Sequence, residues 1–388
     1  MSRCDIGFLC FIKLYCVGEL KVAIIHDWLI DIGGAEKVVA ELFEIFPNAD
    51  VYTLIAQKST VGRLGLERVS QSYLGRVPFI RKFYRIALPF FPTAIESFDL
   101  SKYDLIVSSS SSVAKGVIVS SRQLHVCYCH SPARYMWDLS WQYLHDKEDA
   151  CVFRGLYSLI LRHFLKKLRI WDVVSANRVD YFLANSHYVK RRIEKVYRRA
   201  SEVINPPVDV DKFQLALGVR RDYYFTASRL VAYKKIDVII EAFSMLPTKQ
   251  LVVCGDGPEK GRLERKAGAN VTFVGRLEDC EVVKFMQEAK AFVFAAEEDF
   301  GIVPVEAQAC GCPVICYGCG GVLDTVVDGE TGVYFESQSP DAIVNAITRF
   351  EAMHFDSNKI REHSEKFSRQ AFRGRFSKFL ADVFARNE

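Results

Sequence analysis

The segment AAEEDFGIVPVE, residues 295–306, decides how the rest of this sequence is interpreted. The apolar residues from Lys290 to Ala296 predict a buried strand. Pro304 suits the first turn of a following helix, where its missing N–H does no harm, and Gly311 and Pro313 mark the end of that helix. The free N–H groups at the start of such a helix are a ready site for an anion. A strand, a short loop and a helix in this order indicate an α/β fold.

Two carboxylates flank the predicted start of this helix: Glu298 lies before it, and Glu306 is expected within its first turn. Glu306 alone could simply complement the helix dipole. With Phe300-Gly301 between the two, a Cys-Gly-x-Pro-Val string after them and then Gly320-Gly321, the segment resembles family 4 of the retaining glycosyltransferases. The resemblance covers about residues 21–380. It implies the GT-B fold, in which two Rossmann-like α/β domains face each other across a cleft, and a reaction that takes a sugar from a nucleotide diphosphate.

A chain of 388 residues is too long for one typical core, so two domains are expected. Asn205-Pro206-Pro207 is the predicted hinge, because two prolines stop helix or sheet from running through it. The Asp209-x-Asp211 pair beside the hinge is interpreted as linker caps and not as a metal clamp. An N-terminal extension is expected at residues 1–20, and a Rossmann-like acceptor domain at 21–204. A Rossmann-like nucleotide-sugar donor domain is expected at 205–365. The resemblance further implies a last helix, at 366–388, that crosses back to the first domain.

In the second domain, a predicted strand at residues 223–228 leads to Arg229 and, five residues on, to Lys234. The planar fork of an Arg and the point charge of a Lys can together neutralise a diphosphate. In isolation these would be two solvated surface cations, and Lys235 is a neighbour easily confused with Lys234. The string Ser-Arg-Leu-Val-x-x-Lys matches the family's donor-phosphate pair, so the resemblance gives both residues a part in catalysis.

Residues 250–261 offer a rival interpretation. A strand followed by G-x-G-x3-G, with Asp279 about twenty residues later, mimics a dinucleotide site. The motif lies in the middle of the chain, however, and Glu259 would be unwelcome near a pyrophosphate. The resemblance instead assigns donor binding to Gly255 and places at the edge of the nucleobase a loop of three residues, Gly275, Arg276 and Leu277.

The first domain begins with a predicted strand at residues 21–25, followed by a glycine loop, Gly33-Gly34, that opens a helix. Such a loop faces ligands in α/β sheets, which bind them at the carboxyl ends of the strands, although Gly-Gly alone could be a plain turn. A strand at 124–130 ends at His130, which would ordinarily be a satisfied structural residue. In the family, the glycine loop lies between donor and acceptor and the matching His lies beside the donor sugar. Asp27 is expected near the acceptor.

One further strand of the first domain is expected at residues 103–108. Five consecutive serines, residues 108–112, predict a loop at its end.

The formal net charge is only +4, but the two halves of the chain differ. Residues 1–204 contain 28 Lys and Arg against 20 Asp and Glu, whereas residues 205–388 contain 23 against 27. A basic half favours an anionic partner, and since no nucleic-acid-binding motif is present, we expect a membrane surface or a phosphorylated acceptor. Residues 76–92 combine five aromatics with four Arg or Lys. They suit the interface of an anionic bilayer, or alternatively a buried helix whose basic residues reach outward.

Twelve cysteines do not form a disulfide pattern, because several lie inside apolar strands, and a reducing cytoplasm is expected. The run Cys310-x-Cys312-x3-Cys316-x2-Cys319 lacks paired knuckles, so no metal site is predicted. No apolar run reaches the roughly 18 residues of a membrane span, and residues 1–19 make a poor signal peptide. The expected location is cytoplasmic, peripheral on the inner face of the membrane, and no cofactor is expected.

The resemblance gives each singled-out residue a role. Arg229, Lys234 and the helix start after Gly301 carry the charge of the leaving diphosphate, the electrostatic contribution that usually dominates such catalysis. Glu306 binds the ribose hydroxyls of the donor. Glu298 and His130 contact the transferred sugar. The remaining donor-binding residues of the glycine loop and the helix start are Gly33, Gly34, Phe300, Gly301 and Ile302.

The string from His130 to Asp138 resembles a subgroup of the family that acts in surface-polysaccharide and O-antigen assembly. The subgroup points to mannose from GDP-mannose as the donor, and to a lipid-linked or lipopolysaccharide glycan as the acceptor. One alternative is another GT-B enzyme, such as a phosphorylase or an epimerase. A second alternative is a non-catalytic membrane-bound assembly protein, and a dehydrogenase is the least favoured class.

Overall fold

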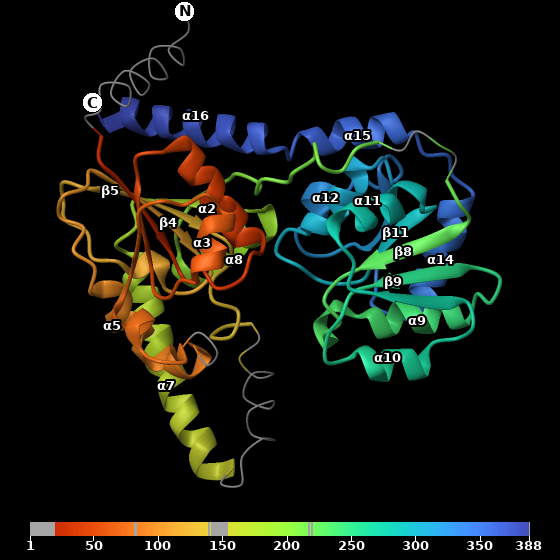
Figure 1. The fold of residues 1–388 in the computed structure, drawn as a ribbon, viewed down its shortest axis with the longest axis horizontal. Helices are drawn as coiled ribbons and strands as arrows, with labels where there is room; N and C mark the ends of the chain where they lie inside the picture. The colour runs from red at the N-terminus through yellow and green to blue at the C-terminus, as the bar shows by residue number, and fades with distance from the viewer. Residues whose placement is uncertain are drawn as a thin grey trace, which may run out of the picture. The chain divides into compact units, whose positions relative to one another are not determined.

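A computed structural model describes residues 20–80, 84–138, 140, 154–215, 218 and 220–387 of the chain. The chain divides into two compact units, the first with residues 1–205 and 373–388 and the second with residues 206–372. Each unit contains one parallel sheet with helices (Figure 1). The expected α/β class with two Rossmann-like domains is therefore confirmed. All but the last residue of the expected N-terminal extension lies outside the described residues.

The first unit is built on a seven-stranded sheet in the order β3-β2-β1-β4-β5-β6-β7, and every neighbouring pair is parallel. β1 and β4 are buried at every residue, because strands covered by helices on both faces need apolar or hydrogen-bonded side chains throughout. The strands are β1 (Val22–His26), β2 (Asp50–Thr53), β3 (Val69–Gln71), β4 (Leu105–Ser110), β5 (Leu124–Cys129), β6 (Tyr181–Ala184) and β7 (Ser201–Val203).

The predicted serine loop is wrong for its first three residues, because β4 continues through Ser110 and only Ser111 and Ser112 lie in the turn that follows. Ser108, Ser109 and Ser110 are all buried strand residues. Their hydroxyls are tolerated in the sheet because each has a hydrogen-bond partner. The glycine loop opens α2 as expected. The helical segments of this unit are α2 (Gly34–Ile45), α3 (Lys58–Arg63), η1 (Tyr73–Arg76), η2 (Tyr84–Phe90), α5 (Phe91–Glu96), η3 (Ala114–Gly116), α7 (Arg154–Ala176) and α8 (His187–Tyr197).

The second unit is built on a six-stranded parallel sheet in the order β10-β9-β8-β11-β12-β13. Counted from β8, this is the doubly wound order 3-2-1-4-5-6 of a Rossmann fold. The strands are β8 (Tyr223–Ala227), β9 (Gln250–Cys254), β10 (Val271–Gly275), β11 (Ala291–Phe294), β12 (Val314–Tyr317) and β13 (Gly332–Phe335).

Helices cover both faces of this second sheet (Figure 1). Successive side chains of β11 pack against the helices on opposite faces. Phe292 and Phe294 pack into one core cluster with α11 and α12, whereas Val293 packs into the other with α9, α10 and α14. The helical segments are η4 (Ala232–Lys234), α9 (Ile236–Ser244), α10 (Lys260–Lys266), α11 (Asp279–Glu288), α12 (Ile302–Ala309), α13 (Val322–Thr325), α14 (Pro340–Glu351) and α15 (Ser357–Glu365).

The last helix, α16 (Arg369–Asn387), starts in the second unit and belongs to the first from Arg373 onward. Phe376 packs edge-on against Phe46 of the first unit with 6.4 Å between ring centroids. Arg373 donates to the buried Glu41 carboxylate on α2. The last turns of the chain therefore complete the core of the first unit.

None of the helices in the described ranges is both long and apolar enough to cross a bilayer. In the same ranges, no group of three or more His, Cys, Asp or Glu side chains is arranged to hold a metal ion.

Candidate functional site

The predicted donor residues of the second unit gather at one edge of its sheet. Because all six strands are parallel, the loops that follow them leave from the same edge. β8 and β11 are neighbours where the strand order reverses, which is where Rossmann-like sheets bind ligands. The loops at this edge carry Arg229 and Lys234 after β8, Gly255 after β9, Gly275, Arg276 and Leu277 at the end of β10, and Glu298 and Gly301 after β11.

Lys234 and Glu298 meet at this reversal point, although 64 residues separate them in the sequence. The Lys234 ammonium forms an ion pair with Glu298 Oε1, and the two side chains are only 14% and 19% exposed. Lys235, the neighbour that could be confused with Lys234, instead takes a left-handed backbone conformation and caps α9. The structure thus joins one predicted phosphate-binding cation to the predicted sugar-binding carboxylate.

Gly255 and Gly257 support the loop that carries Arg229. A Cβ atom on Gly255 would lie 1.8 Å from the carbonyl oxygen of Ser228, and one on Gly257 would lie 2.3 Å from that of Leu230. The Leu230 N–H donates to the Asp256 carbonyl at 2.9 Å. Because the protein's own backbone fills the space beside these glycines, they are not an open cradle for a pyrophosphate. Gly255 influences the site by fixing the Arg229 loop.

The helix start after β11 has the backbone that the sequence predicts, with one correction. Gly301 caps α12 at a φ of +86°, a conformation that favours glycine. The helix begins at Ile302, so Glu306 is its fifth residue and lies in the second turn, not in the first. Phe300 is 3% exposed and its ring packs on Phe367 at 5.7 Å, so its side chain contributes to the core and does not reach a ligand.

Gly320 and Gly321 hold the Glu298 loop in place. The Gly321 N–H donates to the Glu298 carbonyl at 2.8 Å. A Cβ atom on Gly321 would lie 2.2 Å from the Asp299 carbonyl oxygen, and one on Gly320 would lie 2.6 Å from that of Glu298. The glycine pair therefore permits a close approach of two loops, which fixes the backbone that carries the Glu298 carboxylate.

In the first unit, a buried cluster forms where β1, β4 and β5 end side by side. His130 Nε2 lies 2.8 Å from the Ser109 hydroxyl. That hydroxyl lies 3.2 Å from His26 Nδ1, and His26 Nε2 faces the Glu36 carboxylate at 3.5 Å. The other oxygen of Glu36 accepts from the Gly33 N–H at 2.8 Å. The cluster thus ties two predicted positions, Gly33 and His130, to three residues that sequence reasoning missed.

Charge is distributed unevenly over this cluster. Burial lowers the pKa of His26, but hydrogen bonding and charge from Glu36 outweigh it, so the net pKa is raised. Burial likewise opposes ionisation of Glu36, yet His26 lowers the pKa of this carboxyl overall. Burial and the positive charge of His26 lower the pKa of His130 to about 3. The shifts therefore favour the charged forms of His26 and Glu36 and the neutral form of His130.

Asp27 does not face a ligand. It is 1% exposed, and its carboxylate accepts four backbone N–H bonds, at 2.6 to 2.9 Å, from Ser111, Ser112, Val113 and Ala114. We expected Asp27 near the acceptor, and the structure shows that its carboxylate is turned to the protein backbone. Its carboxylate is saturated by the turn after β4, and its role is to hold that turn against the end of β1.

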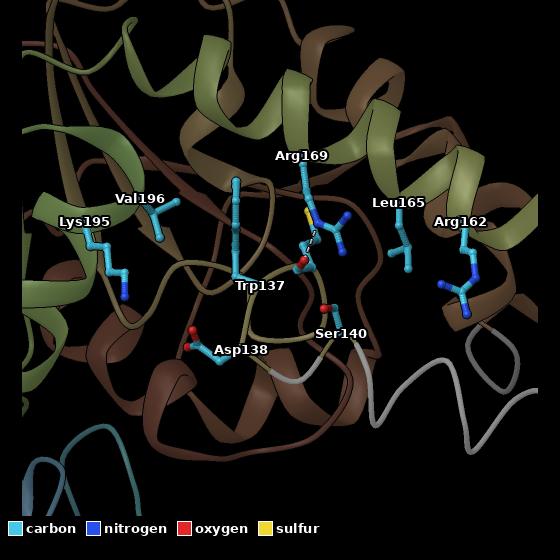
Figure 2. Close-up of a pocket in the computed structure, with 9 residues that line it drawn as sticks. Trp137, Asp138, Ser140, Arg162, Leu165, Arg169, Lys195 and Val196 are labelled. Atoms are coloured by element: carbon cyan, nitrogen blue, oxygen red, sulfur yellow. Dashed lines mark hydrogen bonds between the residues drawn. The ribbon is translucent and has the colours of Figure 1, made fainter.

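A cavity of about 690 Å³ opens in the first unit between α7, α8 and the loop after β5 (Figure 2). Trp137, Arg169 and Lys195 project toward it from these three segments. The Asp138 carboxylate at its rim pairs with Arg192, and Arg169 Nε donates to the Met136 carbonyl at 2.6 Å. The full lining is Met136, Trp137, Asp138, Ser140, Arg162, Leu165, Arg169, Lys195 and Val196.

A buried ionic network is linked to this cavity through Trp137, which belongs to its lining. Lys115 and Asp172 form an ion pair in which the two side chains are 1% and 0% exposed. Asp172 also accepts from Trp137 Nε1 at 2.8 Å and from the Tyr197 hydroxyl at 3.1 Å. Because these residues come from η3, α7, the β5 loop and α8, the network fixes the walls of the cavity relative to one another.

Two family models match the chain. Glycosyltransferase Family 4 matches residues 32–212, and Glycosyl transferases group 1 matches residues 208–372. The two matches follow one another along the chain and reach both compact units.

Curated relatives align with part of the chain. A GDP-mannose-dependent monoacylated alpha-(1-6)-phosphatidylinositol monomannoside mannosyltransferase of Corynebacterium glutamicum is 32% identical over 195 residues, 42% of this chain and 51% of that protein. An uncharacterized glycosyltransferase of Methanocaldococcus jannaschii is 27% identical over 225 residues, 55% of this chain and 62% of that protein. The chain thus spans between half and two thirds of the length of these relatives.

Solved structures share the fold over nearly the whole chain. Sucrose-phosphate synthase from Thermosynechococcus elongatus has a TM-score of 0.68 and 19% identity, covering 94% of this chain and 99% of that chain. Anabaena HepE in complex with UDP has a TM-score of 0.67 and 20% identity, covering 94% and 100%. At sequence identities this low, the structural similarity supports a shared fold and nothing further.

Proposed function

Because the chain belongs to the family 4 glycosyltransferases of the GT-B fold, we propose that it transfers a sugar, with retention, from a nucleotide diphosphate sugar to an acceptor hydroxyl. The observation that carries this proposal is the Lys234–Glu298 ion pair at the β8/β11 reversal point. It brings a cation suited to a diphosphate into contact with a carboxylate suited to sugar hydroxyls, at the sheet edge where Rossmann-like domains bind ligands.

The pair also suggests how the donor enters. A diphosphate at this edge would accept hydrogen bonds from Lys234 and Arg229, and from the free N–H groups at the start of α12. Lys234 would then turn from Glu298 to the phosphate, and the released carboxylate could accept from the hydroxyls of the sugar. These groups would stabilise the charge that develops on the leaving diphosphate, the kind of contribution that is usually the largest in catalysis.

The remaining donor contacts follow the same layout. Glu306, one turn into α12, would hold the ribose hydroxyls. The loop of Gly275, Arg276 and Leu277 would lie along the edge of the nucleobase. From the first unit, the glycine loop at Gly33-Gly34 and His130 would contact the sugar. Arg229, Lys234 and α12 together offset the diphosphate charge without a metal clamp.

For the donor and acceptor, we propose mannose from GDP-mannose and a lipid-linked or lipopolysaccharide glycan. The Corynebacterium relative supports this choice, since its name describes a GDP-mannose-dependent enzyme acting on a mannosylated lipid. The cavity in the first unit is the proposed place for the anionic head of such an acceptor. Among the described residues, its lining includes Arg162, Arg169 and Lys195 and a single carboxylate, Asp138, which is paired with Arg192 (Figure 2).

A second surface of the first unit suits the membrane in which such an acceptor resides. An apolar groove of about 470 Å³ lies over η1 and η2, with Phe79 83% exposed and Phe90 57% exposed. Phe79 keeps this exposed position at a φ of +59°, a conformation that is rare for an aromatic residue. Arg76 is exposed beside the groove. We propose that this groove rests on the anionic inner face of the membrane.

The test is a panel of GDP- and UDP-sugars with the full chain, scored by thermal shift and by nucleotide release in the presence of membrane lipid extract. GDP-mannose should raise the unfolding temperature most and release GDP only when acceptor is present. Conversion of the donor to its epimer without acceptor would assign the chain to the epimerases, and binding without release would make it a non-catalytic assembly protein.

A further inference from the structure

The positions of the protons in the cluster of the first unit depend on the buried His26. Its Nδ1 lies 3.0 Å from the Ser109 carbonyl oxygen, which can only accept, so Nδ1 carries a proton. Its Nε2 faces the Glu36 carboxylate at 3.5 Å, which favours a proton there as well. Asp27 and Glu36 are the carboxylates that act on this ring, and both raise its pKa. These contacts favour the protonated form of the His26 ring, which lies between Ser109 of β4 and Glu36 of α2.

The proton on His26 Nδ1 decides where the Ser109 hydroxyl points. Ser109 is fully buried, and its hydroxyl contacts two imidazole rings, His26 at 3.2 Å and His130 at 2.8 Å. Since His26 Nδ1 is protonated, it cannot accept from the hydroxyl, whereas His130 Nε2 can. Because a buried hydroxyl left without an acceptor is destabilising, the hydroxyl donates to His130. His130 then carries its own proton on Nδ1.

We infer that Glu36, His26 and Ser109 form a positioning chain that holds His130 as the Nδ1–H tautomer, so that the ring offers a hydrogen-bond donor to an oxygen of the transferred sugar. The last step rests on the proposed function. The three chain residues are buried, and they act through His130. The second Glu36 oxygen holds the Gly33 N–H, so the same carboxylate also fixes the glycine loop.

A neutral hydrogen-bond donor suits the proposed reaction. Positive charge develops at the anomeric carbon when the diphosphate leaves, and an imidazolium beside it would raise the energy of that state. The low pKa of His130 keeps its ring uncharged at neutral pH. Positive charge in this cluster is favoured on His26, where the Glu36 carboxylate at 3.5 Å can balance it, and not on His130.

The tautomer can be measured directly by long-range ¹H–¹⁵N correlation spectra of the full chain labelled at histidine, with His130→Gln to identify the His130 signals. At pH 7.5, His130 should show a protonated Nδ1 and an unprotonated Nε2, and His26 should show two protonated nitrogens. In Ser109→Ala, His130 should shift toward the Nε2–H form that predominates for a free histidine side chain. An Nε2–H tautomer in the unaltered protein, or no change in Ser109→Ala, would overturn the inference.

A matched control lies one residue away on β4. Ser108 lies 2.8 Å from His125 Nε2, and His125 Nδ1 faces the Arg178 carbonyl at 3.1 Å, so this second buried Ser–His pair has the same geometry. Ser108→Ala should cost similar thermal stability and change the His125 signals, but should leave the His130 signals and the transfer rate unaltered.

Kinetics connect the tautomer to the reaction. Ser109→Ala should lower kcat about three- to tenfold with little change in the KM of the donor, because only a fraction of the bound enzyme then has the competent tautomer. An unchanged kcat together with a shifted tautomer would overturn the role in transfer. The spectra need no activity, so a failure of the proposed function would leave the tautomer result standing by itself.

Discussion

At the scale of single residues, the two glutamates around α12 have different surroundings. Glu298 lies in the loop before the helix, where it pairs with Lys234 and where Gly320 and Gly321 fix its backbone. Glu306 lies one turn inside the helix. A residue that touches only the nucleotide acts equally in the ground and transition states, whereas one beside the reacting carbon acts mainly in the transition state.

This difference predicts two distinct phenotypes. Glu306→Gln should weaken binding of free GDP by about 1–2 kcal/mol, because a charged hydrogen bond to the ribose is lost. Glu298→Gln should leave GDP affinity nearly unaltered and lower kcat. Titration calorimetry with GDP and steady-state kinetics on each variant measure these effects, and circular dichroism checks the fold. An equal loss of GDP affinity in both variants, or the reverse pattern, would show that the two roles are wrongly assigned.

The residues of the His26 cluster show what single residues do not reveal in a sequence. Glu36, three residues after Gly33, had the spacing of a capping box, which was a usable signal for its contact with the Gly33 N–H. Nothing local connects His26 to Ser109, because strand pairing brings them together across 83 residues. Small polar residues are typical of turns, so the serine run predicts a loop, yet histidines and a backbone N–H satisfy the hydroxyls of the first three serines inside β4.

At the scale of elements, α7 is attached to the first unit through ionic contacts. The Lys115–Asp172 pair joins it to η3, and Asp172 further joins it to the β5 loop and to α8. A buried ion pair adds little net stability by itself, but the loss of one partner leaves the other charge uncompensated. The exposed pair of Lys102 and Asp50, with side chains 61% and 26% exposed, provides the comparison.

Lys115→Met should therefore destabilise the chain by about 3–5 kcal/mol, because Asp172 is left as a buried, uncompensated carboxylate. Lys102→Met should cost roughly 0–1 kcal/mol, since water screens the exposed pair. Urea denaturation gives both values. If Lys115→Met cost no more than Lys102→Met, the network would not be the framework of the cavity. Adding Asp172→Asn to Lys115→Met should recover part of the loss.

The cations of the cavity give a prediction about the acceptor. Arg162→Ser with Lys195→Ser should raise the KM of an anionic acceptor several-fold, since each charged hydrogen bond to a phosphate contributes about 1.5–3 kcal/mol before screening. The KM of the donor should not change. Lys166→Ser with Arg191→Ser, on the same two helices but outside the lining, is the matched control. Equal effects of both double variants would point to a general charge effect and not to a site.

At the scale of the whole molecule, the sequence predicted the two α/β domains because its apolar strands, glycine loops and double proline are local signals. It also predicted the positions of Arg229, Lys234, Glu298 and Gly301 at strand ends. It could not give the strand orders, which decide that β8 and β11 are neighbours and that Lys234 reaches Glu298. Likewise, it did not show that the Phe300 ring and the Asp27 carboxylate point into the protein, because side-chain direction depends on packing.

Association with membranes is a prediction for the entire chain. The protein should co-sediment with anionic vesicles and less so with neutral ones, and high salt should weaken the binding by screening surface charge. Phe79→Ser with Phe90→Ser should reduce binding, because these rings are the most exposed apolar groups of the groove. Met353→Ser removes an exposed apolar side chain, 40% exposed, from the second unit and serves as the control. Unaltered binding of the Phe double variant would place the membrane contact elsewhere.

The central claim, that the β8/β11 edge of the second unit holds a nucleotide diphosphate, is tested most directly by comparing two adjacent lysines. Calorimetric titrations with GDP, UDP and the corresponding monophosphates would be performed on the unaltered chain, Lys234→Asn and Lys235→Asn. Lys234→Asn should weaken binding of the preferred diphosphate roughly 10- to 100-fold, the equivalent of one charged hydrogen bond, and weaken the monophosphate less. Lys235→Asn should leave both affinities unaltered, because asparagine tolerates the left-handed backbone of this residue. A loss of affinity in Lys235→Asn but not in Lys234→Asn, or an unaltered chain that binds none of these nucleotides, would contradict the account.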